Sequence, residues 1–180
     1  MAEEKHVDRE GLLNKFKELG IENIVTVEHP EVFTVEEMMP HVKHEPGIHC
    51  KNLFLRDKKK RLWLFAGRHD LEVRLNELAK KVGASGGLRF ADESVLVEKL
   101  GVRQGCVTVY ALINDKKNDV KLILDSALIE RAHPRIFFHP LTNAASTGIS
   151  PEDLIKFLDA INHKPLLINL DVPKITEQAL

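Results

Sequence analysis

One seven-residue run combines a strand that is apolar on both faces with a lysine and an asparagine near its start. The run is HCKNLFL, residues 49–55. Successive side chains of a strand point to opposite faces, so Leu53 and Leu55 face one way and Phe54 faces the other. Because both faces carry large apolar groups, the run predicts an interior strand with apolar cover on both sides. The chain is therefore constrained to fold around a covered sheet.

The polar pair Lys51 and Asn52 at the mouth of this strand has two interpretations. A cleft that binds a phosphate or a carboxylate needs such a pair, because a lysine ammonium is a point charge for oxyanions and an asparagine amide both donates and accepts hydrogen bonds. Alternatively, Lys51 is a strand-end lysine whose aliphatic stem lets its ammonium reach solvent. The local pattern leaves both interpretations open.

Length and composition fit one compact domain. With 180 residues, of which 43% are hydrophobic, the chain can bury a core without disulfides or metals. Its two cysteines, Cys50 and Cys106, form no C-x-x-C pair, and no apolar run approaches the roughly 18 residues that span a bilayer. The first residues, MAEEKH, are acidic rather than apolar, so we expect a cytoplasmic protein without a membrane anchor.

The formal net charge of −1 limits the ways in which the chain could bind nucleic acid. It argues against binding through overall electrostatics and predicts no DNA partner, although a local basic patch could dock one end of an RNA. The run Lys58–Arg61 is such a patch. It is either a solvated hairpin tip, whose lysines also suppress aggregation, or a contact for the phosphates of a tRNA acceptor stem.

Periodicity and capping residues predict an α+β domain with a mixed sheet. The predicted helices cover residues 12–19, a short segment from 34 that ends before Pro40, residues 70–82, 92–100 and 150–161. The predicted strands cover residues 23–28, 53–56, 62–66, 107–113, 120–124, 136–141 and 166–170. Two hairpins are expected, one around the basic turn 57–60 and one joining 107–113 to 120–124. Neither a linker nor an internal repeat divides the chain.

Several motifs occur in the order found in one known family. They are EHPEVFTVEE at 28–37, HCKNLFL at 49–55, RLWLFA at 61–66, ALIND at 111–115, FHPLTN at 138–143 and SPEDL at 150–154. Over about residues 28–171 the chain resembles the YbaK/prolyl-tRNA synthetase editing-domain superfamily, and within it the free-standing prolyl-tRNA synthetase associated domain. The resemblance implies a trans-editing deacylase that hydrolyses mischarged Ala-tRNA(Pro) by water attack on the ester, without a cofactor.

The resemblance also implies site residues. Lys51 would neutralise phosphate or developing oxyanion charge, Asn52 would orient the substrate, and His139 would position it. The family has a G-x-x-x-P loop whose main chain lines the cleft, and here the loop begins at Gly105 and has Val109 in place of the proline. If only loop geometry matters, proline should be tolerated at 109, whereas a Val109 N–H that is bonded in a following strand would make it costly. The remaining residues expected to contact substrate are His49, Phe33, Cys106, Val107, Thr108 and Asn143.

Four potential zinc ligands and two other functions compete with this assignment. His41, His44, His49 and Cys50 lie within ten residues, but their spacing matches no structural zinc motif, so we predict no bound metal. The partners expected are the 3′ end of an aminoacyl-tRNA and prolyl-tRNA synthetase. Two alternatives stay open: a deacylase for another mischarged tRNA, such as Cys-tRNA(Pro) or Ser-tRNA, and a catalytically weak module that binds tRNA or a synthetase.

Overall fold

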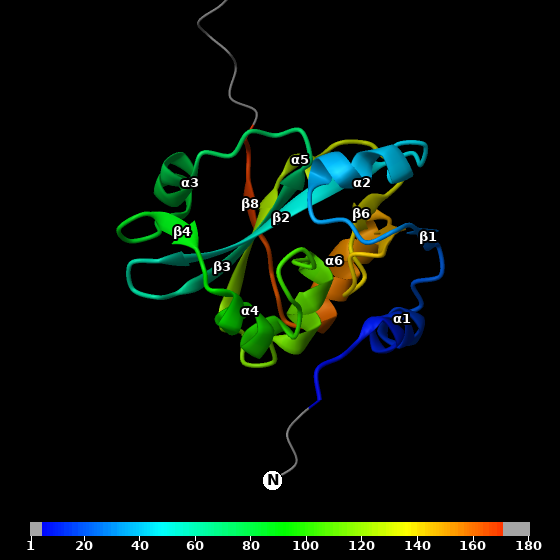
Figure 1. Cartoon of the computed structure of the whole chain (residues 1–180), viewed down its shortest axis with the longest axis horizontal. Coiled ribbons are helices and arrows are strands. Elements are labelled where there is room, and N and C mark those ends of the chain that lie inside the picture. The colour runs from blue at the N-terminus through cyan, green and yellow to red at the C-terminus, as the bar shows by residue number, and fades with distance from the viewer. Residues whose placement is uncertain (1–4, 171–180) are drawn as a thin grey trace, which may run out of the picture.

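The computed structural model describes residues 5–170, which form an eight-stranded mixed sheet with helices on both faces (Figure 1). The strand order is β1-β7-β6-β2-β3-β5-β8, and β4 pairs with β2. This confirms the predicted α+β domain with a mixed sheet. Asp171, where the family resemblance ends, lies outside the described residues. The helices are α1 Arg9–Glu18, α2 Val35–Val42, α3 Leu75–Val82, α4 Glu93–Leu100, the 3-10 helix η1 Val109–Asn114, α5 Ala127–Glu130 and α6 Pro151–Ala160. The strands are β1 Val25–Glu28, β2 Ile48–Asp57, β3 Leu62–Arg68, β4 Leu88–Phe90, β5 Val120–Asp125, β6 Ile136–Phe138, β7 Ala145–Ile149 and β8 Leu166–Ile168.

The sheet is covered on both faces because its central strands are apolar on both faces. Along β3, Leu64 and Ala66 join the core that contains residues of α1, α4, η1 and α6. Their neighbours Trp63 and Phe65 join a second core under α3. All four side chains are buried, as expected for a strand with neighbours on both edges and helices above and below. None of the helices within residues 5–170 has the length and apolar character needed to cross a membrane.

Local signals placed several elements correctly. The basic turn joins β2 to β3 as an antiparallel hairpin, with Lys60 in the left-handed region at φ 63°. Thr34 caps α2 by accepting from the Glu37 N–H at 3.1 Å, and Ser150 caps α6 in the same way. Gly83, at φ 70°, ends α3. These features depend on neighbours in sequence, so the sequence alone predicts them.

The predicted second hairpin is wrong. Residues 109–114 form the 3-10 helix η1, and β5 pairs in parallel with β3 on one edge and β8 on the other, so no edge of β5 is open to a hairpin partner. Tyr110 fixes η1 in place: its ring is fully buried and its hydroxyl donates to the Thr147 carbonyl at 2.9 Å. The β-branched residues of the segment had indicated burial rather than a strand.

Several boundaries also differ from the prediction, three of them in segments near the cavity. Helix α2 continues through Pro40 to Val42, because burying Val42 beside Val32 contributes roughly 1.5–3 kcal/mol and offsets the hydrogen bond that proline removes. Helix α3 begins at Leu75 rather than after Asp70, since the preceding loop folds over β2. The strand expected over 136–141 stops at Phe138, and the strand β7 that follows was missed because its residues are small.

Candidate active site

One edge of β2 is shared by two short strands that leave a gap between them. Strand β6 pairs with residues 48–49 of β2 and β4 pairs with residues 55–57, while β3 occupies the opposite edge throughout. The Phe54 carbonyl accepts from the Ala91 N–H at 3.0 Å on the β4 side, whereas the His49 carbonyl accepts from the His69 N–H at 2.9 Å on the β3 side. By strand alternation the main chain of Asn52 points into the gap.

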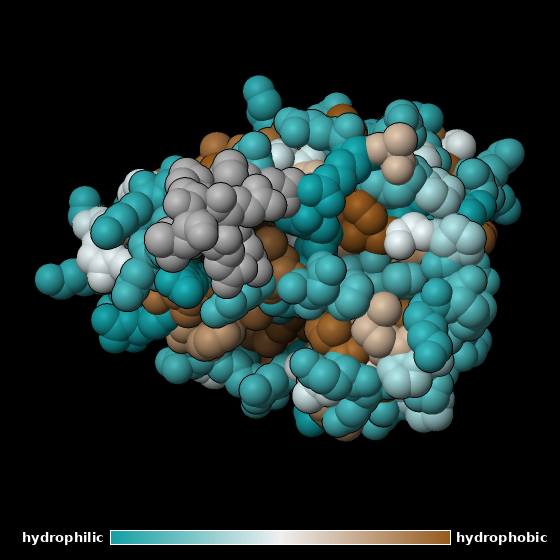
Figure 2. Space-filling view, turned by 90° about the horizontal axis from the view of Figure 1, so that it is seen from above, coloured by the Kyte–Doolittle hydropathy of each residue, from teal (hydrophilic) through white to brown (hydrophobic). Residues whose placement is uncertain are grey.

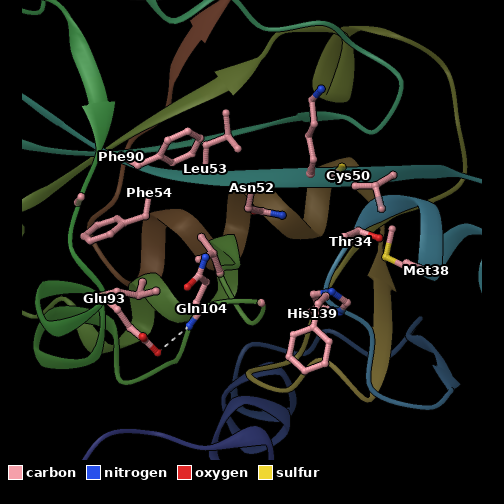
Figure 3. Close-up of a pocket in the computed structure, with 17 residues that line it drawn as sticks. Thr34, Met38, Cys50, Asn52, Leu53, Phe54, Phe90, Glu93, Gln104 and His139 are labelled. Carbon is pink, nitrogen blue, oxygen red and sulfur yellow. Dashed lines mark hydrogen bonds between the residues drawn. The ribbon is translucent and has the colours of Figure 1, made fainter.

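A cavity of about 450 Å³ opens at this gap. Seen from above, the surface of the molecule is mostly hydrophilic, with hydrophobic side chains at the floor of a hollow (Figure 2). In the close-up, Asn52 and Phe54 point from β2 toward the cavity, and His139 and Gln104 lie across from them (Figure 3). Five chain segments therefore meet here. The lining residues are Phe33, Thr34, Val35, Met38, Cys50, Lys51, Asn52, Leu53, Phe54, Phe90, Ala91, Glu93, Leu96, Gln104, Gly105, Val107 and His139.

Lys51 is held at the cavity by the loop that precedes α3. Its ammonium donates a hydrogen bond to the Leu71 carbonyl. Burial lowers the pKa of Lys51, and the carboxylates of Asp70, Glu36 and Glu72 oppose that shift. By strand alternation the Lys51 side chain leaves β2 on the face opposite that of Asn52 and Phe54, and two donors of its ammonium take no part in this bond. The loop before α3, which the sequence predicted to be helical, thus positions Lys51.

The side-chain amide of Asn52 has a fixed orientation. The Val109 N–H donates to Oδ1 of Asn52 at 3.2 Å. Because only the oxygen can accept, this contact leaves the amide nitrogen, with its two donors, on the cavity side (Figure 3). The N–H of Val109, at the start of η1, is therefore bonded to the Asn52 side chain and not to a neighbouring strand. Val109 is neither a loop residue that acts through geometry alone nor a residue of a strand ladder, the two roles that the sequence suggested.

Gly105 lies in the cavity wall with a backbone that only glycine adopts easily. Its φ is +91°, and a Cβ there would meet the Phe33 ring at 3.0 Å. Asn143 supports this wall from behind: its side-chain nitrogen donates to the Val32 carbonyl at 2.9 Å. Burial raises the pKa of the Cys106 thiol, although the Asn143 N–H opposes the shift, so the thiolate that a nucleophile requires is disfavoured.

His139 presents an unprotonated nitrogen to the cavity. Nδ1 lies 2.8 Å from the Ala145 carbonyl, which can only accept, so Nδ1 carries the proton of the neutral ring and Nε2 is left as an acceptor. Burial lowers the pKa of His139; the bond to Ala145 opposes this and nearby His29 adds to it. The ring of His41 stacks on His29 at 5.8 Å. The geometry therefore favours neutral His139.

The structure separates the predicted site residues into three groups. Lys51, Asn52, Gly105, His139, Phe33 and Val107 line the cavity. Cys106, Thr108, Val109 and Asn143 lie outside its lining, although Val109 bonds the lining residue Asn52, and Asn143 bonds Val32, which precedes the lining residue Phe33. His49 faces a different hollow, with Arg68 and His69, and its ring stacks on Phe137 at 4.7 Å.

Sequence reasoning missed part of the cavity. Phe90, Glu93 and Gln104 line it but belong to no motif recognised in the sequence. The Gln104 N–H donates to the Glu93 carboxylate at 3.4 Å, which closes one side of the cavity (Figure 3). Of these three residues, only Phe90, an aromatic residue shortly before the cap of α4, could have been suspected from its local sequence. In the described part of the chain, no cluster of three His, Cys, Asp or Glu side chains is arranged to hold a metal ion.

Comparison with known proteins places the chain in a family. Residues 29–157 match the aminoacyl-tRNA editing domain model, so the chain belongs to the aminoacyl-tRNA editing domain family. The prolyl-tRNA synthetase associated domain-containing protein 1 of Bos taurus is 56% identical over 147 residues, covering 81% of this chain and 85% of the bovine protein. The prolyl-tRNA editing protein ProX of Acetoanaerobium sticklandii is 33% identical over 153 residues, covering 84% of this chain and 91% of ProX. The resemblance stated from the motifs is confirmed.

A solved structure agrees on the fold. The crystal structure of a candidate trans-editing enzyme for prolyl tRNA synthetase superposes with a TM-score of 0.63 at 21% identity, covering 89% of this chain and 96% of that one. At 21% identity, this similarity shows a shared fold and nothing further.

The contact between Val109 and Asn52 generates a stability prediction. Val109 is the first residue of η1, a position that accommodates a proline ring, so Val109→Pro should fold but lose the bond to Asn52, which contributes about 0.5–1.5 kcal/mol. Urea unfolding of Val109→Pro, Asn52→Ala and the double variant should give a coupling energy of about 1 kcal/mol. Val109→Ile, which keeps the N–H, is the matched control. If the losses of unfolding free energy in the two single variants add up to the loss in the double variant, the bond contributes nothing.

Proposed function

We propose that the protein is an aminoacyl-tRNA deacylase that hydrolyses Ala-tRNA(Pro) in trans. The observation that carries the proposal is the meeting of Lys51, the donor side of the Asn52 amide and open main chain of β2 at one cavity. Such convergent donors stabilise charge that develops on an ester carbonyl. Membership of the editing-domain family, and the names of ProX and the bovine relative, support tRNA as the carrier and proline as the tRNA identity.

In the proposed reaction a water molecule attacks the ester carbonyl. Its oxygen bonds to the carbonyl carbon and the bond to the ribose oxygen breaks. One water proton restores the ribose hydroxyl, the other is released to solvent, and alanine leaves as a carboxylate. The Asn52 amide nitrogen donates to the developing oxyanion, and the Lys51 ammonium stabilises negative charge there or on the adjoining phosphate. His139 accepts a hydrogen bond from the substrate through Nε2 and so orients it. We take water as the nucleophile, because Cys50, the cysteine that lines the cavity, is buried and burial raises the pKa of its thiol.

The proposed specificity for alanine depends on size exclusion by a second, editing pocket. A synthetase pocket built for proline rejects a smaller amino acid by only about 1–3 kcal/mol, because a missing methylene is worth little. An editing pocket that is too small for proline corrects the error. Phe33, which packs over Gly105, and the wall residue Met38 narrow the cavity on the side across from Asn52 and are the side chains that we assign to size exclusion.

A panel of aminoacylated tRNAs tests the proposed function. Purified protein should release alanine from Ala-tRNA(Pro) at a rate well above the uncatalysed one and should leave Pro-tRNA(Pro) intact, because proline does not fit the pocket. Cys-tRNA(Pro) and Ser-tRNA in the same panel reveal a different substrate. Failure to hydrolyse any member would instead favour a binding module and refute the deacylase assignment.

Replacing Lys51 should remove most of the activity and spare the fold. The loss of a charged donor to the oxyanion or phosphate costs on the order of 2–4 kcal/mol in the transition state, or about 30- to 1,000-fold in kcat/KM. Lys51→Met keeps the aliphatic stem, and Lys156→Ala, an exposed lysine of α6 away from the cavity, is the control. A Lys51→Met protein that deacylates at the wild-type rate would exclude Lys51 as a principal contributor.

The rate should depend on pH with two limbs. Neutral His139 is the required form and its pKa is lowered, so activity should persist below the ordinary histidine range and fall only at more acidic pH. Charged Lys51 is required and its pKa is also lowered, so activity should fall with rising pH before the ordinary lysine range is reached.

Initial rates, corrected for uncatalysed hydrolysis at each pH, measure both limbs. His139→Asn should lose the acid limb together with part of its rate, whereas His41→Asn, which changes an exposed histidine outside the cavity lining, should retain that limb. An unchanged acid limb in His139→Asn would contradict the assignment.

A further inference from the structure

Two arginines face each other across the ladder between β2 and β4. Arg56 is the direct cross-strand partner of Arg89. Like charges at such positions are destabilising. No ion pair joins either guanidinium to a carboxylate among residues 5–170. The fold therefore keeps an unneutralised pair of positive charges at this end of the sheet.

The adjoining turn extends this charge. Lys58, Lys59 and Lys60 follow in the β2–β3 turn, and the carboxylate that precedes them in sequence, Asp57, is fully buried and bonded to Arg61 at 2.7 Å. We call Arg56, Lys58, Lys59, Lys60 and Arg89 the basic end. It lies where the β2–β3 hairpin and β4 project to one side of the molecule (Figure 1). In a chain whose formal net charge is −1, this is a local concentration of positive charge.

An exposed aromatic side chain connects the basic end to the cavity. Phe90 directly follows Arg89, is 63% exposed and lies beside Leu53 at the cavity (Figure 3). Phe33, which is 64% exposed, also lines the cavity. Along β2, Arg56 is roughly 16 Å from Lys51 at about 3.3 Å per residue. A strand of RNA that ends in the cavity would therefore pass Phe90 before it reaches the basic end.

We infer that the basic end and Phe90 form the docking surface for the RNA strand that leads into the cavity. The arginines and lysines contact its phosphates, and Phe90 stacks on a base. Solvation of a turn would account for the three lysines alone, but it leaves the facing arginines and the exposed Phe90 unexplained. The identity of the RNA as the acceptor end of a tRNA rests on the proposed function.

Binding of uncharged tRNA(Pro), followed by fluorescence anisotropy over a series of salt concentrations, tests the inference without requiring hydrolysis. Arg56→Ala/Arg89→Ala should weaken binding about tenfold or more and reduce the slope of log K against log salt by about 1.5–2, because two phosphate contacts are lost. Its melting temperature should stay equal or rise, since the like-charge pair is removed. The charge-matched control, Lys156→Ala/Lys164→Ala on α6 and the turn after it, should bind as wild type.

Phe90 gives a complementary signature. Phe90→Ala should lose affinity by about tenfold while the salt slope stays unchanged, and Phe90→Trp should restore binding, because stacking is a neutral contact. If the arginine double variant binds tRNA with wild-type affinity and slope, the inference is overturned, and an acidic protein surface becomes the better occupant of the basic end.

The two proposals fail separately. Hydrolysis of a short substrate, alanine esterified to a CpA dinucleotide, reports on the cavity chemistry and should be the same in the arginine double variant as in wild type. Salt-dependent tRNA binding through the basic end without any ester hydrolysis would support the docking surface and refute the deacylase. Ester hydrolysis, together with tRNA binding that is insensitive to the arginine substitutions, would support the deacylase and refute the docking surface.

Discussion

The site depends on an incomplete strand pairing. One edge of β2 is divided between β6 at its start and β4 at its end, and neither is long enough to reach the other. Main-chain groups in the interior of a sheet are normally consumed by neighbouring strands. Around Asn52 they face a cavity instead. Extending both short strands by two or three residues would close the gap, so the brevity of β4 and β6 is what gives this fold a pocket.

The gap is connected to the core through η1. The ring of Tyr110 packs edge-on against Phe16 at 5.4 Å, and its hydroxyl holds the Thr147 carbonyl. Because Tyr110 is fully buried, the preceding residue, Val109, presents its N–H to Asn52 from a rigid support. Val109 supplies a donor that the proline expected here from the motif resemblance would lack. In this chain the orientation of the amide is therefore fixed by the main chain of a packed helix.

Burial acts in the same direction on the two ionisable groups of the cavity, with different consequences. It lowers the pKa of His139 and so favours the neutral ring, whose Nε2 is available as an acceptor. It also lowers the pKa of Lys51, but nearby carboxylates oppose the shift and favour the ammonium. An acceptor and a cationic donor thus occur at one cavity, where reduced solvent strengthens the contacts of both.

Local sequence determined much of the fold and part of the site. The covered strand HCKNLFL, the turn before β3, the caps at Thr34 and Ser150 and the glycine at 105 depend on neighbours along the chain. Only the tertiary structure decided which strands meet, because pairing is a property of the whole sheet. It turned residues 109–114 into a helix, gave both edges of β5 to parallel partners and directed His49 away from the cavity. It also set Arg56 opposite Arg89, which no local pattern contains, since register is fixed by residues more than thirty positions apart.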